Sequence, residues 1–252
     1  MFTLSRATVT LVLLIVHAAA ANQPSKDAIR DGGLVDVTVM IESYCPCSGA
    51  FSAAFQEFVS PKVGNLVNLD RIFDAGSKGT QGCCNPSADV DTVTCMHGLT
   101  ECTADRLQAC AQKLYPEWRD WLGYTVCIAG NCDNRPDAMG CKSQFIVGKD
   151  ENRDREVKCA NNMTFVMDDI DDCWNGPDGV QAMQMNADRS DYFGQAVYGL
   201  DGLPAVWVEG EIFGSFFDCD GSSDKYVSSL TAKICEVYQQ KNPGSGVPSG
   251  CE

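Results

Sequence analysis

Cysteine content constrains this chain more than any other feature of its sequence. The 252 residues include fifteen cysteines, a density typical of secreted proteins whose folds are held by disulfides. Because fifteen is odd, at least one thiol stays free, reactive or bonded to another molecule. The sequence therefore predicts several structural disulfides and at least one cysteine with a different task.

The first residues predict a secretory route. Residues 1–21 combine Arg6, an apolar run over residues 9–16 and four alanines at 18–21, which is the pattern of a signal peptide. The apolar run is too short to span a bilayer comfortably, which disfavours the alternative of an N-terminal anchor. Asn162 begins an Asn-Met-Thr glycosylation sequon that this route can use. We expect a protein that is secreted or lysosomal (vacuolar), without a membrane span.

The charge of the chain excludes one class of partner. The net charge is −15, whereas proteins that bind nucleic acids do so largely through lysine and arginine contacts to phosphates. A nucleic-acid partner is therefore not expected.

Regular structure is predicted at both ends of the mature chain. After a polar leader at 22–34, residues 35–41 read as a buried strand, and apolar spacing then predicts a helix that ends at Ser60-Pro61. A second strand follows at 66–73. Residues 203–213 predict two strands around a turn, and a last helix begins near residue 223. The order β–α–β, insertion, β–β–α predicts an α/β, thioredoxin-like fold over residues 35–240.

The part between these ends is predicted to be an insertion at about residues 75–190. It is rich in cysteine and contains helical patterns, for example at 104–114 and 179–187. We interpret it as a largely helical insertion held by disulfides. Cys83 and Cys84 lie in its first loop, and their role is not assigned. A Pro/Gly/Ser-rich tail at 241–252 contains Cys251.

Cys45 stands where the first strand meets the first helix. A helix N-terminus offers unpaired amides and the positive end of the macrodipole, and both favour a thiolate, which is the attacking form of cysteine. Pro46 suits the first helical turn because its missing amide needs no partner there. We predict that Cys45 is a nucleophile with a lowered pKa.

The rest of the Cys45-Pro46-Cys47-Ser48 motif leaves three interpretations open. In the first, Cys47 resolves a mixed disulfide on Cys45 through a short Cys-x-Cys bridge. In the second, Cys45 acts alone, an external thiol releases it, and Ser48 donates a hydrogen bond. In the third, Cys45 or Cys47 pairs structurally with a distant cysteine.

Pro204 is the second predicted site residue. It precedes the late strand, the place where a thioredoxin-like fold holds a cis-proline against the attacking cysteine. Only a few percent of such bonds are cis in general, so this prediction depends on the topology. The alternative is an ordinary turn proline.

A zinc site is the metal alternative. His97 is the only histidine after the predicted signal peptide, and it lies near Cys95, Cys102 and Cys110. The spacing matches no established zinc pattern, and secretory cysteines usually pair with one another. We therefore predict no metal.

Residues 95–110 read Cys-Met-His-Gly-Leu-Thr-Glu-Cys-Thr-Ala-Asp-Arg-Leu-Gln-Ala-Cys. This segment resembles the C-Q-H-G-x-x-E-C-x-x-N-x-x-x-x-C signature of the gamma-interferon-inducible lysosomal thiol reductase (GILT) family. The matching positions are Cys95, His97, Gly98, Glu101, Cys102 and Cys110. Met96 and Asp105 replace the family's Gln and Asn. The resemblance implies that Cys45 is the first active-site cysteine and that Leu203-Pro204 is the proline-containing loop.

The resemblance also implies an activity. Relatives reduce disulfides of unfolding proteins in acidic compartments, so we expect disulfide exchange on protein substrates. Small thiols such as cysteine or glutathione would be the electron donors, and no bound cofactor is expected. We interpret the signature cysteines as structural. Because Ser48 replaces the usual second cysteine, a catalytically impaired binding protein and a disulfide isomerase remain alternatives. The oligomeric state is not predicted.

Overall fold

The computed structural model describes residues 33–74, 95, 99–129, 150–197, 203–215 and 223–252. All of them fall in one unit of the chain, Gly33–Glu252. The predicted signal peptide lies outside the described residues, as do Cys83, Cys84, His97 and Gly98. No described helix is both long enough and apolar enough to cross a membrane.

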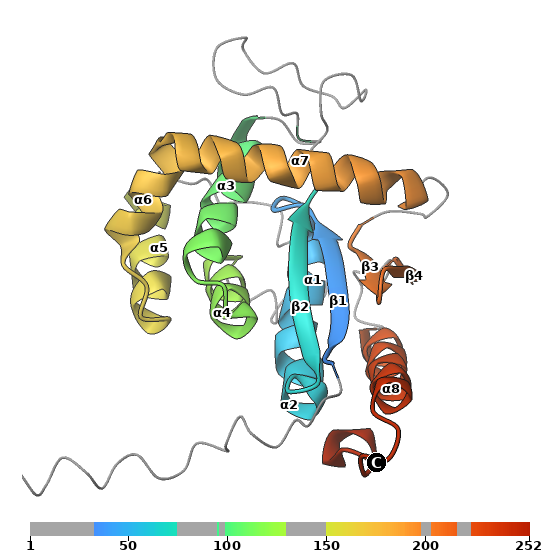
Figure 1. Cartoon of the computed structure of the whole chain (residues 1–252). Coiled ribbons are helices and arrows are strands. Elements are labelled where there is room, and N and C mark those ends of the chain that lie inside the picture. Colours follow the sequence, from blue (N-terminus) through green and yellow to red (C-terminus); the bar gives the residue numbers. More distant parts are fainter. Residues whose placement is uncertain (1–32, 75–94, 96–98, 130–149, 198–202, 216–222) are drawn as a thin grey trace, which may run out of the picture. The chain divides into compact units, whose positions relative to one another are not determined.

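Four strands of the described residues form one mixed sheet (Figure 1). They are β1 (Val35–Ile41), β2 (Val67–Phe73), β3 (Ala205–Val208) and β4 (Glu211–Ser215), in the order β2-β1-β3-β4. β1 runs parallel to β2, and β3 runs antiparallel to both β1 and β4. This order and these directions confirm the predicted thioredoxin-like fold.

The connection from β1 to β2 is helical throughout and has three parts. It begins as α1 (Pro46–Ala54), continues as a π-helix, η2 (Phe55–Val59), and ends as α2 (Ser60–Val63). The prediction that the helix ends at Ser60-Pro61 is therefore wrong. The π-helical turn changes the hydrogen-bond spacing, so Pro61 falls in the first turn of α2, where a proline needs no amide partner.

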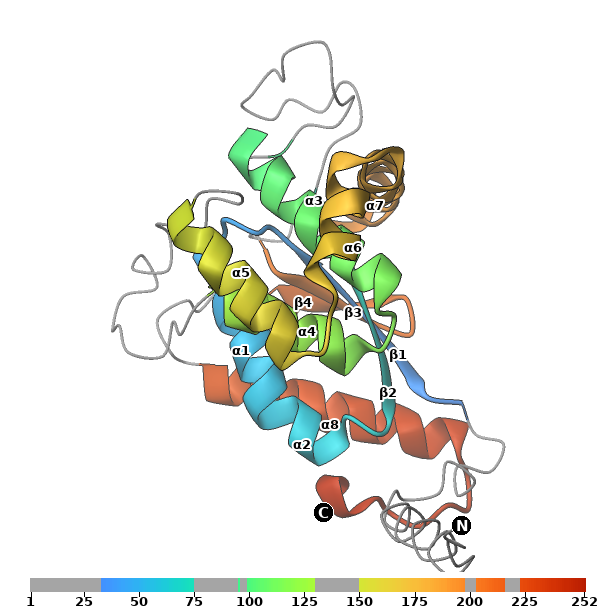
Figure 2. The ribbon, with the colours of Figure 1, turned by 90° about the vertical axis from the view of Figure 1, so that its left-hand side faces the viewer.

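Five described helices lie between β2 and β3, and one long helix follows β4 (Figures 1 and 2). They are α3 (Leu99–Leu114), α4 (Trp118–Ala129), α5 (Asp150–Asn162), α6 (Met167–Asn175), α7 (Pro177–Val197) and α8 (Ser223–Lys241), with a 3-10 turn, η5 (Ser249–Cys251), near the end. The helical character predicted between the two halves of the sheet is present. The boundaries of the insertion stay a prediction.

Successive strand residues point to opposite sides of the sheet, and helices pack on both faces. Val37 and Val39 of β1 belong to a core that includes Phe55 of η2 and Ile234 of α8. Trp207 of β3 lies on the other side, in a smaller cluster with Met40 and Ile72, against which Phe193 of α7 packs. The sheet is thus held between helices, which fixes the end of β1 from which the thiol-bearing turn emerges.

Four disulfides join the described elements. Cys95–Cys102 closes the start of α3, Cys110–Cys173 joins α3 to α6, Cys127–Cys159 joins α4 to α5, and Cys235–Cys251 ties the C-terminal segment to α8. Three of the four hold the helices between β2 and β3. The predicted structural disulfides are therefore confirmed.

Candidate active site

Cys45 is the N-cap residue of α1. Its backbone is extended (φ −78°, ψ 117°), and Pro46 lies in the first helical turn, where the amides have no helical partners. The chain reaches this position through a turn, residues 42–45, closed by a hydrogen bond from the Cys45 amide to the Glu42 carbonyl at 3.2 Å. We call these four residues the thiol turn. Of the described cysteines, Cys45 alone carries a free thiol, and it is partly exposed.

The loop before β3 lies beside this thiol. The Leu203–Pro204 peptide bond is cis, as predicted, and the Cys45 Sγ lies 3.7 Å from the carbonyl oxygen of Leu203. The two segments meet because β1 and β3 are neighbours in the sheet. The structure thus brings together Cys45 and Pro204, the two predicted site residues that are farthest apart in the sequence.

Cys47 and Ser48 lie in different surroundings. Cys47 is disulfide-bonded, and because the Cys45 thiol is free, no Cys45–Cys47 bridge is formed in this structure. Ser48 is buried; its hydroxyl oxygen accepts a hydrogen bond from the Glu42 amide at 3.1 Å, and both its amide and its hydroxyl bond to the Cys45 sulfur. Cys47 is thus bonded as in the third interpretation, while Cys45 remains available to act alone, as in the second.

The pKa of Cys45 contradicts the expectation from the sequence. Burial raises the pKa of this thiol, hydrogen bonds from Ser48 and from the Cys47 amide lower it, and the Glu42 carboxylate raises it; the net change is a rise. The donors expected at a helix start are therefore present. Loss of solvation around the sulfur outweighs them, and the predicted lowering is wrong.

Two of the buried carboxyl groups near the thiol turn have raised pKa values. Burial raises the pKa of Glu42 to about 8, with Glu101 and Asp74 adding to the effect. Burial also raises the pKa of Asp105, and the charge of Glu101 adds to that rise. Near pH 5 Glu42 therefore favours the protonated form, and the equilibrium of Asp105 is shifted in the same direction.

Helix α3 holds the backbone of the thiol turn. Asp105 accepts hydrogen bonds at Oδ1 from the Ser43 amide, at 3.1 Å, and from the Ser43 hydroxyl. Glu101, a matching signature position, accepts one at Oε1 from the Tyr44 amide at 3.2 Å. The segment that carries the family resemblance therefore contacts the turn that carries Cys45. Sequence spacing gave no sign of this contact.

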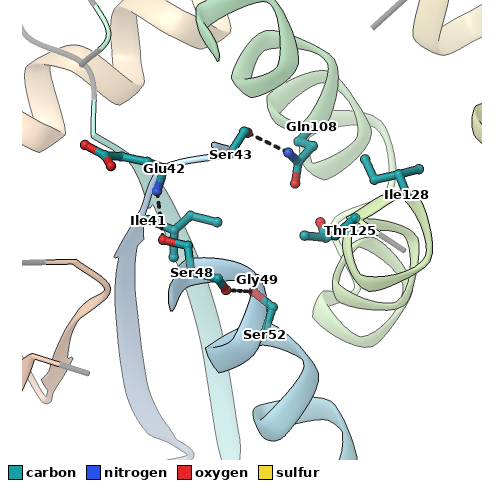
Figure 3. A pocket seen from close by; sticks show the side chains of 10 residues that line it. Ile41, Glu42, Ser43, Ser48, Gly49, Ser52, Gln108, Thr125 and Ile128 are labelled. Carbon is teal, nitrogen blue, oxygen red and sulfur yellow. Dashed lines mark hydrogen bonds between the residues drawn. The ribbon is translucent and has the colours of Figure 1, made fainter. Parts of the chain in front are cut away.

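A directed chain of hydrogen bonds continues from Ser43 into the core. Gln108 donates through Nε2 to the Ser43 hydroxyl at 2.7 Å, and Arg71 donates through Nη1 to Gln108 Oε1 at 3.0 Å. Figure 3 shows Ser43 and Gln108 directed toward one another. Arg71 is buried, which lowers its pKa to about 9. Sequence reasoning missed this network; its only signal was the polar pair Glu42-Ser43 between an apolar strand and Cys45.

A small cavity lies beside the thiol turn (Figure 3). Its volume is about 30 Å³, and its lining includes Glu42, Ser43, Ser48, Gln108 and Thr125. This volume is large enough to hold water.

The cysteines considered as zinc ligands are not available as thiolates in this structure. Cys95, Cys102 and Cys110 are all consumed in disulfides, and a disulfide sulfur is not the thiolate that zinc requires. Within the described ranges, no group of three histidine, cysteine or carboxylate side chains is placed to hold a metal ion. The signature cysteines thus staple α3, in line with their structural interpretation.

Known proteins share parts of this sequence. A protein of Arabidopsis thaliana named "Gamma-interferon-responsive lysosomal thiol protein" is 27% identical over 103 residues, which cover 38% of this chain and 38% of that protein. A GILT-like protein of Caenorhabditis elegans is 28% identical over 125 residues, covering 48% of this chain and 54% of the relative. The matched part therefore spans about half or less of either relative's length.

Solved structures are more distant. A thioredoxin-like oxidoreductase from Silicibacter pomeroyi has 15% sequence identity and a TM-score of 0.43, over 80% of this chain and 88% of that one. At this level of similarity, the fold assignment depends on the strand order and directions described above.

A family model covers the segments that build the site, except the Leu203–Pro204 loop. Residues 36–145 match the model described as gamma interferon inducible lysosomal thiol reductase, and this range contains β1, the thiol turn, β2 and the signature segment. The family resemblance found in the sequence is confirmed by this match over residues 36–145 and by the two similar proteins.

Proposed function

We propose that this protein is a thiol–disulfide oxidoreductase that reduces disulfides of protein substrates through Cys45. The observation that carries the proposal is the free Cys45 thiol at the start of α1, 3.7 Å from the carbonyl oxygen that precedes the cis-proline. The match of residues 36–145 to the GILT family model supports the same chemistry.

The reaction begins with attack by the Cys45 thiolate on one sulfur of a substrate disulfide. A bond forms between Cys45 and that sulfur, and the other substrate sulfur leaves as a thiolate that takes up a proton. Hydrogen bonds from Ser48 and from the Cys47 amide stabilise the thiolate when it forms. They act against the burial of the sulfur, so these donors determine how much of the attacking form is present.

Release of the substrate requires a second thiol. Because Cys47 is already disulfide-bonded, we propose that a small external thiol, such as glutathione or cysteine, attacks Cys45 and frees the reduced substrate. A second molecule of the same thiol then removes the first and leaves as the small-molecule disulfide. The sum is one substrate disulfide reduced and two external thiols oxidised.

The test is the reduction of insulin by glutathione at about pH 5 and about pH 7. Wild type is compared with Cys45→Ser and with Cys47→Ser, and circular dichroism checks that each variant folds. We expect Cys45→Ser to fall to the uncatalysed rate, because the nucleophile is gone, and Cys47→Ser to keep its activity. Equal rates for wild type and Cys45→Ser would refute the proposal. Loss of activity in a folded Cys47→Ser would restore Cys47 as the resolving cysteine.

A disulfide isomerase is the second candidate function. A single free thiol beside a bonded Cys47 can attack a mispaired disulfide and be released by another cysteine of the same substrate, without net reduction. Recovery of scrambled ribonuclease without added glutathione would favour this activity over reduction.

We also propose that the protein travels the secretory route to an endolysosomal compartment. The four structural disulfides and the relative named as lysosomal support this route. Asn162 is exposed at the end of α5 and Thr164 is exposed two residues later, so the sequon is accessible to glycosylation. In secreting cells, an amidase that removes N-glycans should reduce the apparent mass of wild type and leave Asn162→Gln unchanged.

A further inference from the structure

Asp105 of α3 makes two hydrogen bonds to one residue of the thiol turn. Its Oδ1 accepts from both the amide and the hydroxyl of Ser43. The direction of the hydroxyl is fixed, because Gln108 donates its Nε2 proton to the Ser43 oxygen. Gln108 is fixed in turn, because its Oε1 accepts from Arg71, which has no lone pair to offer. Oδ1 of Asp105 is therefore an acceptor, and a proton on this carboxyl belongs on Oδ2.

Oδ2 is the unusual atom of this carboxyl. It is buried and has no hydrogen-bond partner among the described residues, and the Asp105 side chain has no exposed surface. A buried carboxylate oxygen without a donor carries a large desolvation cost, whereas the neutral acid carries a smaller one. The geometry of Oδ2 alone therefore favours the neutral acid.

The titratable and charged neighbours of Asp105 come from three segments. Glu101 lies one turn earlier on α3, and Glu42 and Tyr44 belong to the thiol turn. Arg71 of β2 is the cation that faces this group. The charge of Arg71 interacts with Asp105 and also with Asp70 of its own strand, so this buried guanidinium is shared between carboxyl groups.

In the part of the chain that the structure describes, the side-chain contacts of α4 and α7, which also pack on α3, add no ion pair to this cluster. From α4, Thr125 takes part through its hydroxyl, which accepts a hydrogen bond from Arg71. On α7, Asp178 pairs with Lys113 at 3.0 Å, and Arg189 pairs with Asp70. These ion pairs lie at the surface, so they are screened by solvent.

We propose that Asp105 is a positioning residue that, as the neutral acid, holds the thiol turn in place through Ser43. The proposal deepens the proposed function, because the turn that it positions carries Cys45. When the pH rises and the proton leaves Oδ2, a buried charge appears beside Glu101 and Glu42, and the contact between α3 and the turn loosens. Burial and the charge of Glu101 raise the pKa of Asp105 against the two hydrogen bonds from Ser43 that lower it, so this loss occurs at a higher pH than it would for an exposed aspartate.

Asp105→Asn tests the proposal, because asparagine keeps the Oδ1 acceptor and cannot ionise. Asp105→Ala removes the acceptor altogether. Asp178→Asn, on the neighbouring α7, makes the same charge change at an exposed ion pair and serves as the matched control. The measurements are the pH profile of insulin reduction and amide hydrogen exchange of the peptide that covers residues 42–45, each between about pH 5 and about pH 8.

In wild type and Asp178→Asn, exchange protection of the thiol turn, corrected for intrinsic rates, should fall about tenfold or more across this range. Their reductase activity relative to that of Asp105→Asn should fall over the same interval, because the increase of thiolate with pH is common to all variants. Asp105→Asn should lose less protection of the thiol turn than wild type across the range, with activity near the wild-type level at about pH 5. Asp105→Ala should lose both at every pH.

A folded Asp105→Asn whose profiles match those of wild type would overturn the proposal, as would an Asp105→Ala that retains protection and activity. If Asp105→Ala does not fold, the comparison of Asp105→Asn with wild type decides. Exchange that behaves as expected in an enzyme with no reductase activity would refute the proposed function and leave the role of Asp105 standing. Normal reductase activity together with Asp105→Asn profiles equal to those of wild type would support the proposed function and refute the role of Asp105.

Discussion

At the start of α1, the reaction of the Cys45 thiol depends on the residue at position 48, where a dithiol enzyme has its second cysteine. Ser48 stands where a Cys-x-x-Cys enzyme has its resolving thiol, and its hydroxyl already contacts the Cys45 sulfur. A hydroxyl can stabilise the Cys45 thiolate but cannot attack a mixed disulfide. This residue therefore leaves the release of substrate to an external thiol and makes the mixed disulfide on Cys45 long-lived.

Ser48→Cys should shorten the life of that mixed disulfide. After reaction with glutathione disulfide, wild type should retain glutathione on Cys45. The Ser48→Cys variant should instead expel it and form a bridge between Cys45 and the introduced thiol, because the side chains at these two positions are in contact. Intact mass and peptide mapping distinguish the two products. Ser52→Cys is the control; the Ser52 hydroxyl contacts the Ser48 carbonyl at 2.8 Å, one helical turn farther from Cys45. An adduct that persists equally in Ser48→Cys would contradict this account.

Among the elements, α3 links the site to the rest of the helices. Its first turns hold the thiol turn through Glu101 and Asp105, and its two disulfides differ in the length of chain they close. Cys95–Cys102 spans 7 residues and Cys110–Cys173 spans 63. A longer loop restricts the unfolded chain more, so the second bridge should contribute more to stability.

Removing each bridge by paired alanine substitution tests this difference. Loss of Cys110–Cys173 should lower the free energy of unfolding by about 4 kcal/mol, and loss of Cys95–Cys102 by about 2.5 kcal/mol. Urea denaturation at one pH provides both values, and the double substitution of Cys235 and Cys251, which closes 16 residues, should fall between them. The reverse order would mean that the bridges act through local packing in the folded state and not through the unfolded chain.

The sequence predicts those features that depend on local patterns, and it does not predict those that depend on contacts between distant segments or on burial. The β1 strand, the Glu209-Gly210 hairpin and the meeting of Cys45 with Pro204 follow from local patterns combined with one known topology. The continuation of the helix through Pro61 depends on a π-helical turn, which the spacing of apolar residues does not predict. The network of Arg71, Gln108 and Asp105 joins segments that are distant in the sequence, so local patterns do not predict it. The raised pKa of Cys45 depends on burial, which the sequence alone does not give.

Over the whole molecule, pH is the variable to which stability should respond most. The chain carries a net charge of −15, which destabilises a compact state by self-repulsion as more carboxyls ionise. Buried Glu42, with its pKa raised to about 8, acts in the same direction. A carboxyl whose pKa is higher in the folded state binds protons there preferentially, so its contribution is full at low pH and is lost as the pH rises through that folded value.

Stability should therefore decline between about pH 5 and about pH 8, and Glu42→Gln should flatten that decline. A single group with a raised pKa contributes a slope of up to about 1.4 kcal/mol per pH unit within its window, here from about 4.5 to about 8. Glutamine cannot ionise, so this part of the slope disappears, while Asp105 and the surface charges keep the remainder. Urea denaturation at four pH values measures the slope, and Glu57→Gln, an exposed acid on η2, is the control that should keep the wild-type slope. A wild-type stability that stays level or rises across this range would show that Glu42 is ionised in the folded protein at neutral pH, and with it the charge balance inferred for the thiol turn would fail.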